Sequence, residues 1–266
     1  METDPNKAAS GKRYTLLILL IFLSAFMICY GVMLMFGPGR KLKEVRKEFT
    51  IVQTGNNKVD ERVFSDSAWL SLHKEKTFLQ SKTAMAETDS IYLIINLSDS
   101  TANLEISGVT VHSSRVKKIR VSKMFSKGDE YAILSMLSSP LTVTKDYASI
   151  KKEPLMIKMA PKDTSEYKPD ILPDTSDYEP VNYILETNKG IKIYVYQEEK
   201  TKFRDRVNLF GFDLNDRIRN TIQAFKSMIC FDIPEYHPYI KLILPKAEAK
   251  TLYRAIPRKG QAAVYL

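Results

Sequence analysis

The sequence is poor in cysteine, histidine and glycine, and each shortage excludes a class of protein. Its 266 residues include two cysteines, Cys29 and Cys230, which excludes a disulfide-stapled fold and a four-cysteine zinc site. The three histidines stand far apart and no HExxH motif occurs, so no local metal-binding motif is present. The ten glycines form neither GxGxxG nor GxxxxGK[ST], the loops that hold phosphates. We therefore expect neither a metal nor a cofactor.

The charge is basic but not concentrated. Lys and Arg number 40 against 31 Asp and Glu, a net charge of +9. Eight of the basic residues precede residue 49, and the others are interspersed with acidic ones. This pattern is typical of solvated faces, so we expect no nucleic-acid partner, while a contact with an anionic polymer or membrane surface stays open.

One long apolar run lies near the N-terminus. Residues 14–37 contain no charge, and as a helix they measure about 36 Å, enough to cross a hydrocarbon core of about 30 Å. The apolar core of a cleaved signal peptide is shorter, about 7–15 residues. We therefore predict a single transmembrane helix over 14–37, preceded by a cytoplasmic tail of residues 1–13. The side chains expected to anchor it in the lipid bilayer are Leu16, Phe22, Phe26, Met33 and Phe36.

Basic residues flank both ends of this run. Those before it are Lys7, Lys12 and Arg13, and those after it are Arg40, Lys41, Lys43, Arg46 and Lys47. The positive-inside rule, applied to the second group, places the bulk of the chain inside the cell. The same group fits a helix that leaves the membrane with its cations near anionic headgroups. Charge alone leaves the orientation open.

The rest of the chain divides into a stalk and a domain. Residues 38–87 are predicted to be a largely helical juxtamembrane stalk, separated from the membrane helix by a break at the Gly-Pro-Gly sequence of 37–39. The domain, 88–266, is predicted to be mainly β with flanking helices. Short β-rich runs separated by tight turns predict an antiparallel sheet, with strands at 91–97, 102–106, 109–112, 116–121 and 155–159. The clearest hairpin joins 181–186 to 191–196.

Two helices and a last strand complete the predicted domain. A helix over 214–229, capped by Asp213, carries apolar residues on one face, namely Leu214, Ile218, Ile222, Phe225 and Ile229. A second helix over about 246–256 ends at Pro257, and residues 262–266 form a strand.

These residues resemble a known family, the L,D-transpeptidase catalytic domain with its YkuD fold. The opening YLIINLSDSTANLEISGVTVHSSRVKKIRVSK (92–123) is similar to the first hairpins of the family, and PLMIKMAPKD (154–163) to a later strand and loop. The end, YHPYIKL (236–242) followed by KAEAKTLYRAIPRKGQAAVYL (246–266), is similar to the family's Ser-His-Gly-Cys-Ile-Arg-Leu motif, helix, turn and last strand. The resemblance implies a YkuD-like β-sandwich over 88–266.

The resemblance also implies that catalysis is lost. His237 falls on the motif histidine, Pro238 on the glycine, Tyr239 on the nucleophilic cysteine and Lys241 on the arginine. A phenol ionises near pH 10 and is a poor nucleophile toward amides, so a tyrosine does not replace a thiolate. The family's upstream histidine has no counterpart, because no histidine lies between positions 112 and 237. These four residues would line a vestigial cleft.

Cys230 leaves one catalytic alternative open. It lies seven residues before His237, at the end of the amphipathic helix. Either it is a buried, inert thiol or it is a relocated nucleophile.

We therefore hypothesise a single-pass protein of the bacterial inner membrane whose soluble domain faces the periplasm. Lacking the nucleophile, it would be a scaffold component of an envelope-spanning assembly, such as a secretion system, with inner-membrane or periplasmic protein partners. The alternatives are a peptidoglycan-binding module and an active L,D-transpeptidase that uses Cys230.

Overall fold

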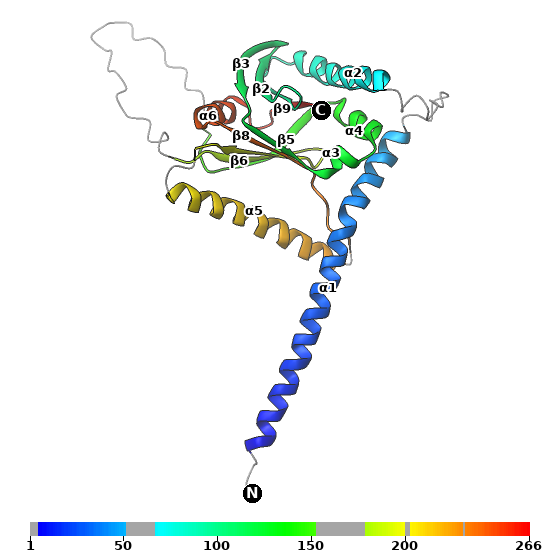
Figure 1. Cartoon of the computed structure of the whole chain (residues 1–266), viewed down its shortest axis with the longest axis vertical. Coiled ribbons are helices and arrows are strands. Elements are labelled where there is room, and N and C mark those ends of the chain that lie inside the picture. The colour runs from blue at the N-terminus through cyan, green and yellow to red at the C-terminus, as the bar shows by residue number, and fades with distance from the viewer. Residues whose placement is uncertain (1–4, 52–66, 153–178, 200–202, 231) are drawn as a thin grey trace, which may run out of the picture. The chain divides into compact units, whose positions relative to one another are not determined.

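The computed structural model describes residues 5–51, 67–152, 179–199, 203–230 and 232–266 (Figure 1). The chain forms two compact units. The first combines residues 1–44 with 216–236, and the second combines 45–215 with 237–266. Each unit is described by itself below.

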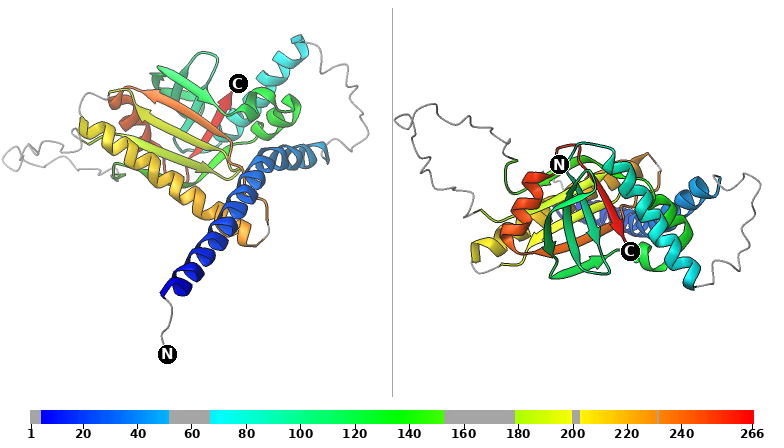
Figure 2. Two further views of the ribbon diagram at one scale, coloured as in Figure 1. Left: turned by 60° about the horizontal axis from the view of Figure 1, so that its bottom comes forward. Right: turned by 90° about the horizontal axis from the view of Figure 1, so that it is seen from above.

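The second unit is built on a nine-stranded mixed sheet with the order β3-β2-β1-β9-β5-β6-β7-β8-β4 (Figure 2). The strands are β1 (Tyr92–Asn96), β2 (Thr101–Ile106), β3 (Val109–Arg115), β4 (Lys118–Val121), β5 (Leu141–Ala148), β6 (Asn182–Thr187), β7 (Lys192–Gln197), β8 (Tyr239–Leu244) and β9 (Gln261–Tyr265). Strand β5 pairs with β9 through its first two residues and with β6 through the rest, so it links the two parts of the sheet. A large β domain after an N-terminal helix is thus confirmed.

The sheet is mixed rather than antiparallel, which corrects the sequence expectation. Strand β9 lies parallel to β1, and β8 lies parallel to β7. Parallel neighbours require a long crossover, and both late strands return to the sheet from far along the chain. The predicted 181–186/191–196 hairpin is confirmed as β6–β7, whereas the predicted strand at 155–159 lies outside the described residues.

Helices cover both faces of the β6–β7 hairpin. The apolar residues of α6 (Lys246–Ala255) face Tyr183, whose ring centroid lies 4.9 Å from that of Tyr253. Leu209 and Phe212 of α5 (Phe203–Ile229) pack on the face that presents Ile184. Successive strand residues point to opposite faces, so the hairpin is buried on both sides. The predicted helix at 246–256 is confirmed.

Helix α2 (Ser67–Ala86) belongs to the domain and not to a stalk. Its Met85 is fully buried in a cluster with Tyr92 and Ile94 of β1. Lys82 Nζ lies 3.0 Å from Oε1 of Glu105, a carboxylate with 3% of its side chain exposed. The expectation of a stalk through residue 87 is therefore corrected: α2 is held by burial and by an ion pair. Two short helices, α3 (Lys123–Lys127) and α4 (Glu130–Leu137), complete the second unit.

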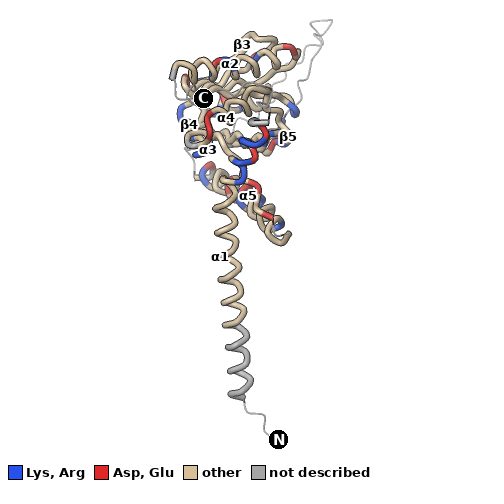
Figure 3. The backbone as a smooth tube through the Cα atoms, turned by 90° about the vertical axis from the view of Figure 1, so that its right-hand side faces the viewer, with Lys and Arg blue, Asp and Glu red and all other residues tan. Residues whose placement is uncertain are grey.

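Helix α1 (Pro5–Ile51) is continuous for 47 residues, about 70 Å. Its stretch Leu17–Glu48 is long and apolar enough to cross a membrane, judged by length and composition. Figure 3 shows the uncharged part of this helix in tan. The predicted break at 37–39 is absent, because the helix passes through Pro38. A proline removes one helical hydrogen bond, and here the helix continues on both sides of it.

Helix α5 begins at Phe203, about ten residues earlier than expected, so Asp213 lies inside it rather than capping it. Val207 and Phe210 precede Leu214 at helical spacings of three and four residues, so the apolar face extends toward the N-terminus and favours a longer helix. Its 27 residues run through both units, with 203–215 in the second and 216–229 in the first.

Candidate functional site

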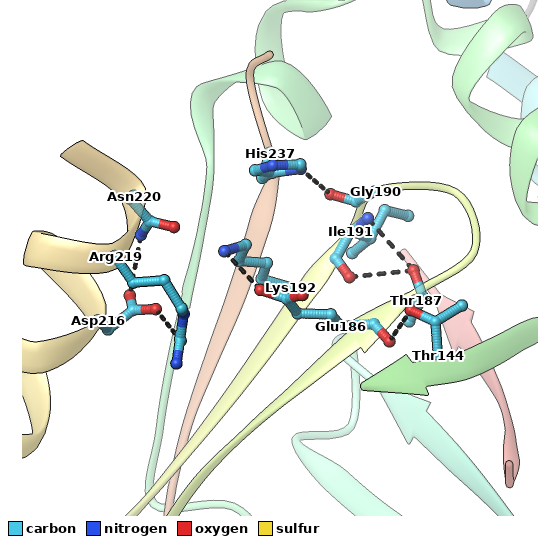
Figure 4. Close-up of polar contacts among 10 residues, drawn as sticks. All are labelled: Thr144, Glu186, Thr187, Gly190, Ile191, Lys192, Asp216, Arg219, Asn220 and His237. Atoms are coloured by element: carbon cyan, nitrogen blue, oxygen red, sulfur yellow. Dashed lines mark hydrogen bonds and ion pairs between the residues drawn. The ribbon is translucent and has the colours of Figure 1, made fainter. Parts of the chain in front are cut away.

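The four residues expected to line a vestigial cleft are neighbours in the structure: His237 and Pro238 directly precede β8, and Tyr239 and Lys241 lie in it. Backbone pairing places Tyr239 opposite Lys192 of β7, whose N–H donates to the carbonyl of Pro238 at 2.8 Å. The Nδ1–H of His237 donates to the carbonyl oxygen of Gly190, 3.2 Å away (Figure 4). His237 is thus held against the β6–β7 turn, where Gly190 has a φ of +73°.

Tyr239 and Lys241 belong to an aromatic cluster, which we name the Tyr–Lys cluster: Tyr194, Tyr196, Tyr239 and Lys241. The Lys241 Nζ lies 4.7 Å from the ring centroid of Tyr194, 5.4 Å from that of Tyr239 and 5.7 Å from that of Tyr196. The Tyr239 ring packs edge-on against Tyr194, with centroids 6.3 Å apart. A cation over aromatic faces is held by electrostatic attraction to the rings. The side chain at the expected nucleophile position therefore serves packing.

A basic pocket of about 320 Å³ adjoins the Tyr–Lys cluster. It is lined by Lys118, Arg120, Tyr196, Leu209, Asp213, Lys241 and Ile243. Lys118 and Arg120 are two residues apart in the edge strand β4, so their side chains share one face of it. Arg120 is the cross-strand partner of Lys241 on the neighbouring strand β8. The Tyr196 hydroxyl donates to the Asp213 carboxylate at 2.8 Å. Three cations and one carboxylate make the pocket suited to an anionic group.

A buried ion pair supports the same strands. Lys192 Nζ lies 2.7 Å from Oε1 of Glu186 on the neighbouring strand, and the lysine side chain is 3% exposed (Figure 4). The two residues are cross-strand partners in the β6–β7 ladder. Because a buried charge needs a partner, this pair fixes the register of the hairpin that holds His237.

Cys230 is exposed, so the alternative of a buried thiol is wrong. It lies just after the last residue of α5, where its N–H donates to the carbonyl of Lys226 at 3.4 Å. Cys230 belongs to the first unit and His237 to the second. Its role as a nucleophile stays a prediction.

A second polar cluster joins β3 to α6 and was not anticipated from the sequence. Glu248 Oε2 lies 2.6 Å from His112 Nε2 and accepts a hydrogen bond of 2.5 Å from the Ser114 hydroxyl. The hydrogen bond from the Ser114 hydroxyl is the main cause that lowers the pKa of Glu248, and His112 lowers it further. Both the serine and the carboxylate approach the same ring nitrogen of His112. A nucleophilic triad needs them on opposite nitrogens, so this cluster joins two elements and does not activate Ser114.

The predicted anchor residues all lie in α1. Phe22 and Phe36 are exposed, whereas Phe26 and Met33 are half-buried. Phe26 contacts Phe225 of α5, with ring centroids 5.6 Å apart. Leu16 lies in the same helix. One helix thus presents apolar side chains along a length sufficient to cross a bilayer.

Comparison with known proteins gives this chain no relatives: no family model, no curated protein and no solved structure matches it.

Proposed function

We propose that this protein is a membrane-anchored, catalytically inactive L,D-transpeptidase-like protein that acts as a scaffold in a bacterial envelope-spanning assembly. The observation that supports it most is the packing of Tyr239 in the Tyr–Lys cluster. An acyl-transfer site needs an activated nucleophile with a base beside it and donors for the oxyanion. Here the expected nucleophile position carries a phenol in edge-on contact with Tyr194, and the His237 ring donates a hydrogen bond to the backbone carbonyl of Gly190.

The arrangement of the C-terminal elements agrees with the resemblance. The motif positions 237–241 run into β8, α6 follows directly, and β9 lies in the sheet beside β1. The YkuD-like fold is part of this proposal. So is the location: α1 spans the inner membrane once, and the sheet domain faces the periplasm.

Purification from native membranes tests the scaffold role. The full chain is extracted in a mild detergent, and co-purifying proteins are quantified by mass spectrometry. We expect membrane or periplasmic partners at stoichiometric amounts. The control is α1 fused to an unrelated soluble domain, which separates partners of the anchor from partners of the sheet domain. A protein that elutes alone contradicts the scaffold role.

Orientation is tested separately by reporter fusions after residue 88. We expect the activity of a periplasmic reporter. Activity of a cytoplasmic reporter at that position contradicts the proposed location.

The basic pocket favours a second candidate function, peptidoglycan binding. Lys118, Arg120 and Lys241 converge on a cavity that suits the carboxylates of stem peptides. Sedimentation of the full chain with purified sacculi tests this function. Arg120→Gln should reduce the bound fraction, with Arg115→Gln on β3, which does not line the pocket, as a charge-matched control. Equal sedimentation of all three proteins contradicts binding through this pocket. The alternative of an active enzyme that uses Cys230 predicts acylation of that thiol by a carbapenem.

A further inference from the structure

One edge of the sheet is open and positively charged. Strand β4 stands last in the strand order, and among the described residues no strand pairs with its outer side. An edge strand presents backbone N–H and C=O groups to which a further strand can bond. Between residues 106 and 128 the sequence has no acidic residue and six cations, namely Arg115, Lys117, Lys118, Arg120, Lys123 and Lys127. This edge therefore offers both free backbone and an excess of positive charge.

Like charges lie opposite each other at this edge. Arg120 is the cross-strand partner of Lys241, and such a pair of equal charges destabilises neighbouring strands. Lys118 and Arg120 are both exposed. Within the part of the chain that the structure describes, neither of these two side chains forms an ion pair. An anionic partner would relieve the repulsion.

The three cations also line the basic pocket, which shows that the edge does more than repel. Lysines on an edge strand commonly guard against pairing between copies of a protein, a role that needs no pocket. Here the cavity of about 320 Å³ has an apolar wall of Leu209 and Ile243, and its one carboxylate, that of Asp213, accepts a hydrogen bond from the Tyr196 hydroxyl. A second copy of β4 would add further cations to the same place. The charges therefore select a partner that is a different, acidic chain.

We infer that β4 is the docking edge for an extended acidic segment of a partner protein, which adds a strand to the sheet and places carboxylates over the basic pocket. This inference rests on the proposed scaffold role and names the chemistry of the partner. Strand addition obtains affinity from main-chain hydrogen bonds and specificity from alternate side chains. Since residues i and i+2 of a strand share a face, the spacing of Lys118 and Arg120 matches an acidic residue at every second position of the partner.

A synthetic peptide tests the inference. The probe is a fluorescent peptide of alternating glutamate and threonine, and the full chain in detergent is titrated into it while the anisotropy is recorded. A peptide of the same composition, with its glutamates in adjacent pairs, is the control for spacing. We expect the alternating peptide to bind more tightly than the control peptide, and its affinity to fall as salt is added.

Matched variants locate the binding site. Lys118→Gln and Arg120→Gln should each weaken binding of the alternating peptide about three- to fivefold, as expected for the loss of one exposed ion pair. Lys117→Gln removes the same charge directly before β4, does not line the pocket, and should change the affinity less than about twofold. Bound peptide should also slow hydrogen exchange in residues 118–121, because an added strand bonds the outer edge of β4.

Four results would overturn the inference. They are equal binding of the two peptides, equal affinity of wild type and both pocket variants, unchanged hydrogen exchange in 118–121, and binding of purified stem-peptide fragments through Lys118 and Arg120 in place of the acidic peptide. The scaffold role is judged separately, by purification of a Lys118→Gln/Arg120→Gln variant from native membranes. Partners that co-purify equally with this variant and with wild type overturn the inference and leave the scaffold role standing. If the peptide binds as expected while the wild type elutes without partners, the docking edge stands and the scaffold role fails.

Discussion

Replacing Lys82 with methionine tests whether α2 is an integral part of the sheet domain. Lys82 is the cation beside Glu105, whose side chain is 3% exposed and also accepts hydrogen bonds from the hydroxyls of Thr110 at 3.1 Å and Tyr92 at 3.3 Å. Loss of one partner from a buried ion pair costs about 3–5 kcal/mol. The Lys82 side chain is 30% exposed and both hydroxyls remain, so we expect a smaller loss of unfolding free energy, about 2 kcal/mol.

The assay is thermal unfolding of the full chain in detergent. The single tryptophan, Trp69, lies on α2, so its fluorescence reports on that helix. A loss of about 2 kcal/mol lowers the melting temperature by roughly 4–8 °C for a domain of this size. Lys76→Met is the matched control, an exposed lysine of the same helix, and should change the unfolding free energy by less than about 0.5 kcal/mol. The double variant Lys82→Met/Glu105→Gln should regain part of the loss, because no unpaired buried charge remains. A melting curve of Lys82→Met equal to that of the wild type refutes the reasoning and makes α2 a separable stalk.

The remaining predictions concern three other sites. Burial, and to a smaller extent Lys76, lowers the pKa of His73, so the fluorescence of Trp69, which is stacked on its ring, should change with an apparent pKa below 6.5; a midpoint above 6.5 contradicts the burial of His73. Ser114→Ala should lower stability by about 1 kcal/mol at pH 7, because the pKa of Glu248 is lowered mainly by the serine hydroxyl. A carboxylate whose folded-state pKa is lowered contributes stability above its unfolded pKa and loses it as the pH falls, so the unfolding free energies of wild type and variant should converge as the pH drops below the ordinary glutamate pKa of about 4.3; a difference that stays constant with pH would contradict this assignment. Gly37→Leu should increase hydrogen exchange in 232–236, since a Cβ there would lie 3.2 Å from the Pro234 carbonyl oxygen, whereas Gly39→Leu, with open space around it, should not.

Local patterns predict most of the strands and the bounds of one helix correctly, because those signals are contained within a few residues. The β6–β7 hairpin and α6 are examples: alternation and a turn define the first, and apolar spacing before a proline defines the second. The sheet order is not predictable in the same way. That β9 pairs with β1, and β8 with β7, depends on contacts between segments far apart in the chain.

Two elements that were not predicted, β5 and α4, do have local sequence signals. Strand β5 contains an alternating Leu-Thr-Val-Thr start, and α4 is preceded by Asp129, whose carboxylate accepts a hydrogen bond from the N–H of Ala132 at 3.4 Å. The cap followed by an apolar run is a sequence signature of a helix start. By contrast, the continuity of α1 through Pro38 runs against the local rule. A proline on its own predicts a helix break. Here α1 continues through Pro38, and residues 234 and 236 lie against the adjacent Gly37.

The candidate site was predictable in part. The motif resemblance indicates four positions within residues 237–241, of which Tyr239 and Lys241 lie in β8 and the other two directly precede it. The Tyr–Lys cluster was not foreseen, because Tyr194 and Tyr196 come from a different strand whose parallel pairing with β8 has no local signature. The basic pocket likewise depends on β4 pairing with β8, which brings Lys118 and Arg120 beside Lys241.

Intact-mass analysis after exposure to a carbapenem tests the central claim most directly. Carbapenems acylate the nucleophilic thiol of active L,D-transpeptidases, and the claim is that this domain has no such nucleophile. The full chain in detergent is incubated with excess carbapenem alongside an active L,D-transpeptidase as a positive control. We predict an unchanged mass for this protein and a stoichiometric adduct on the control. A rapid, stoichiometric adduct that maps to Cys230 and is abolished by Cys230→Ser would contradict the account and identify an active enzyme.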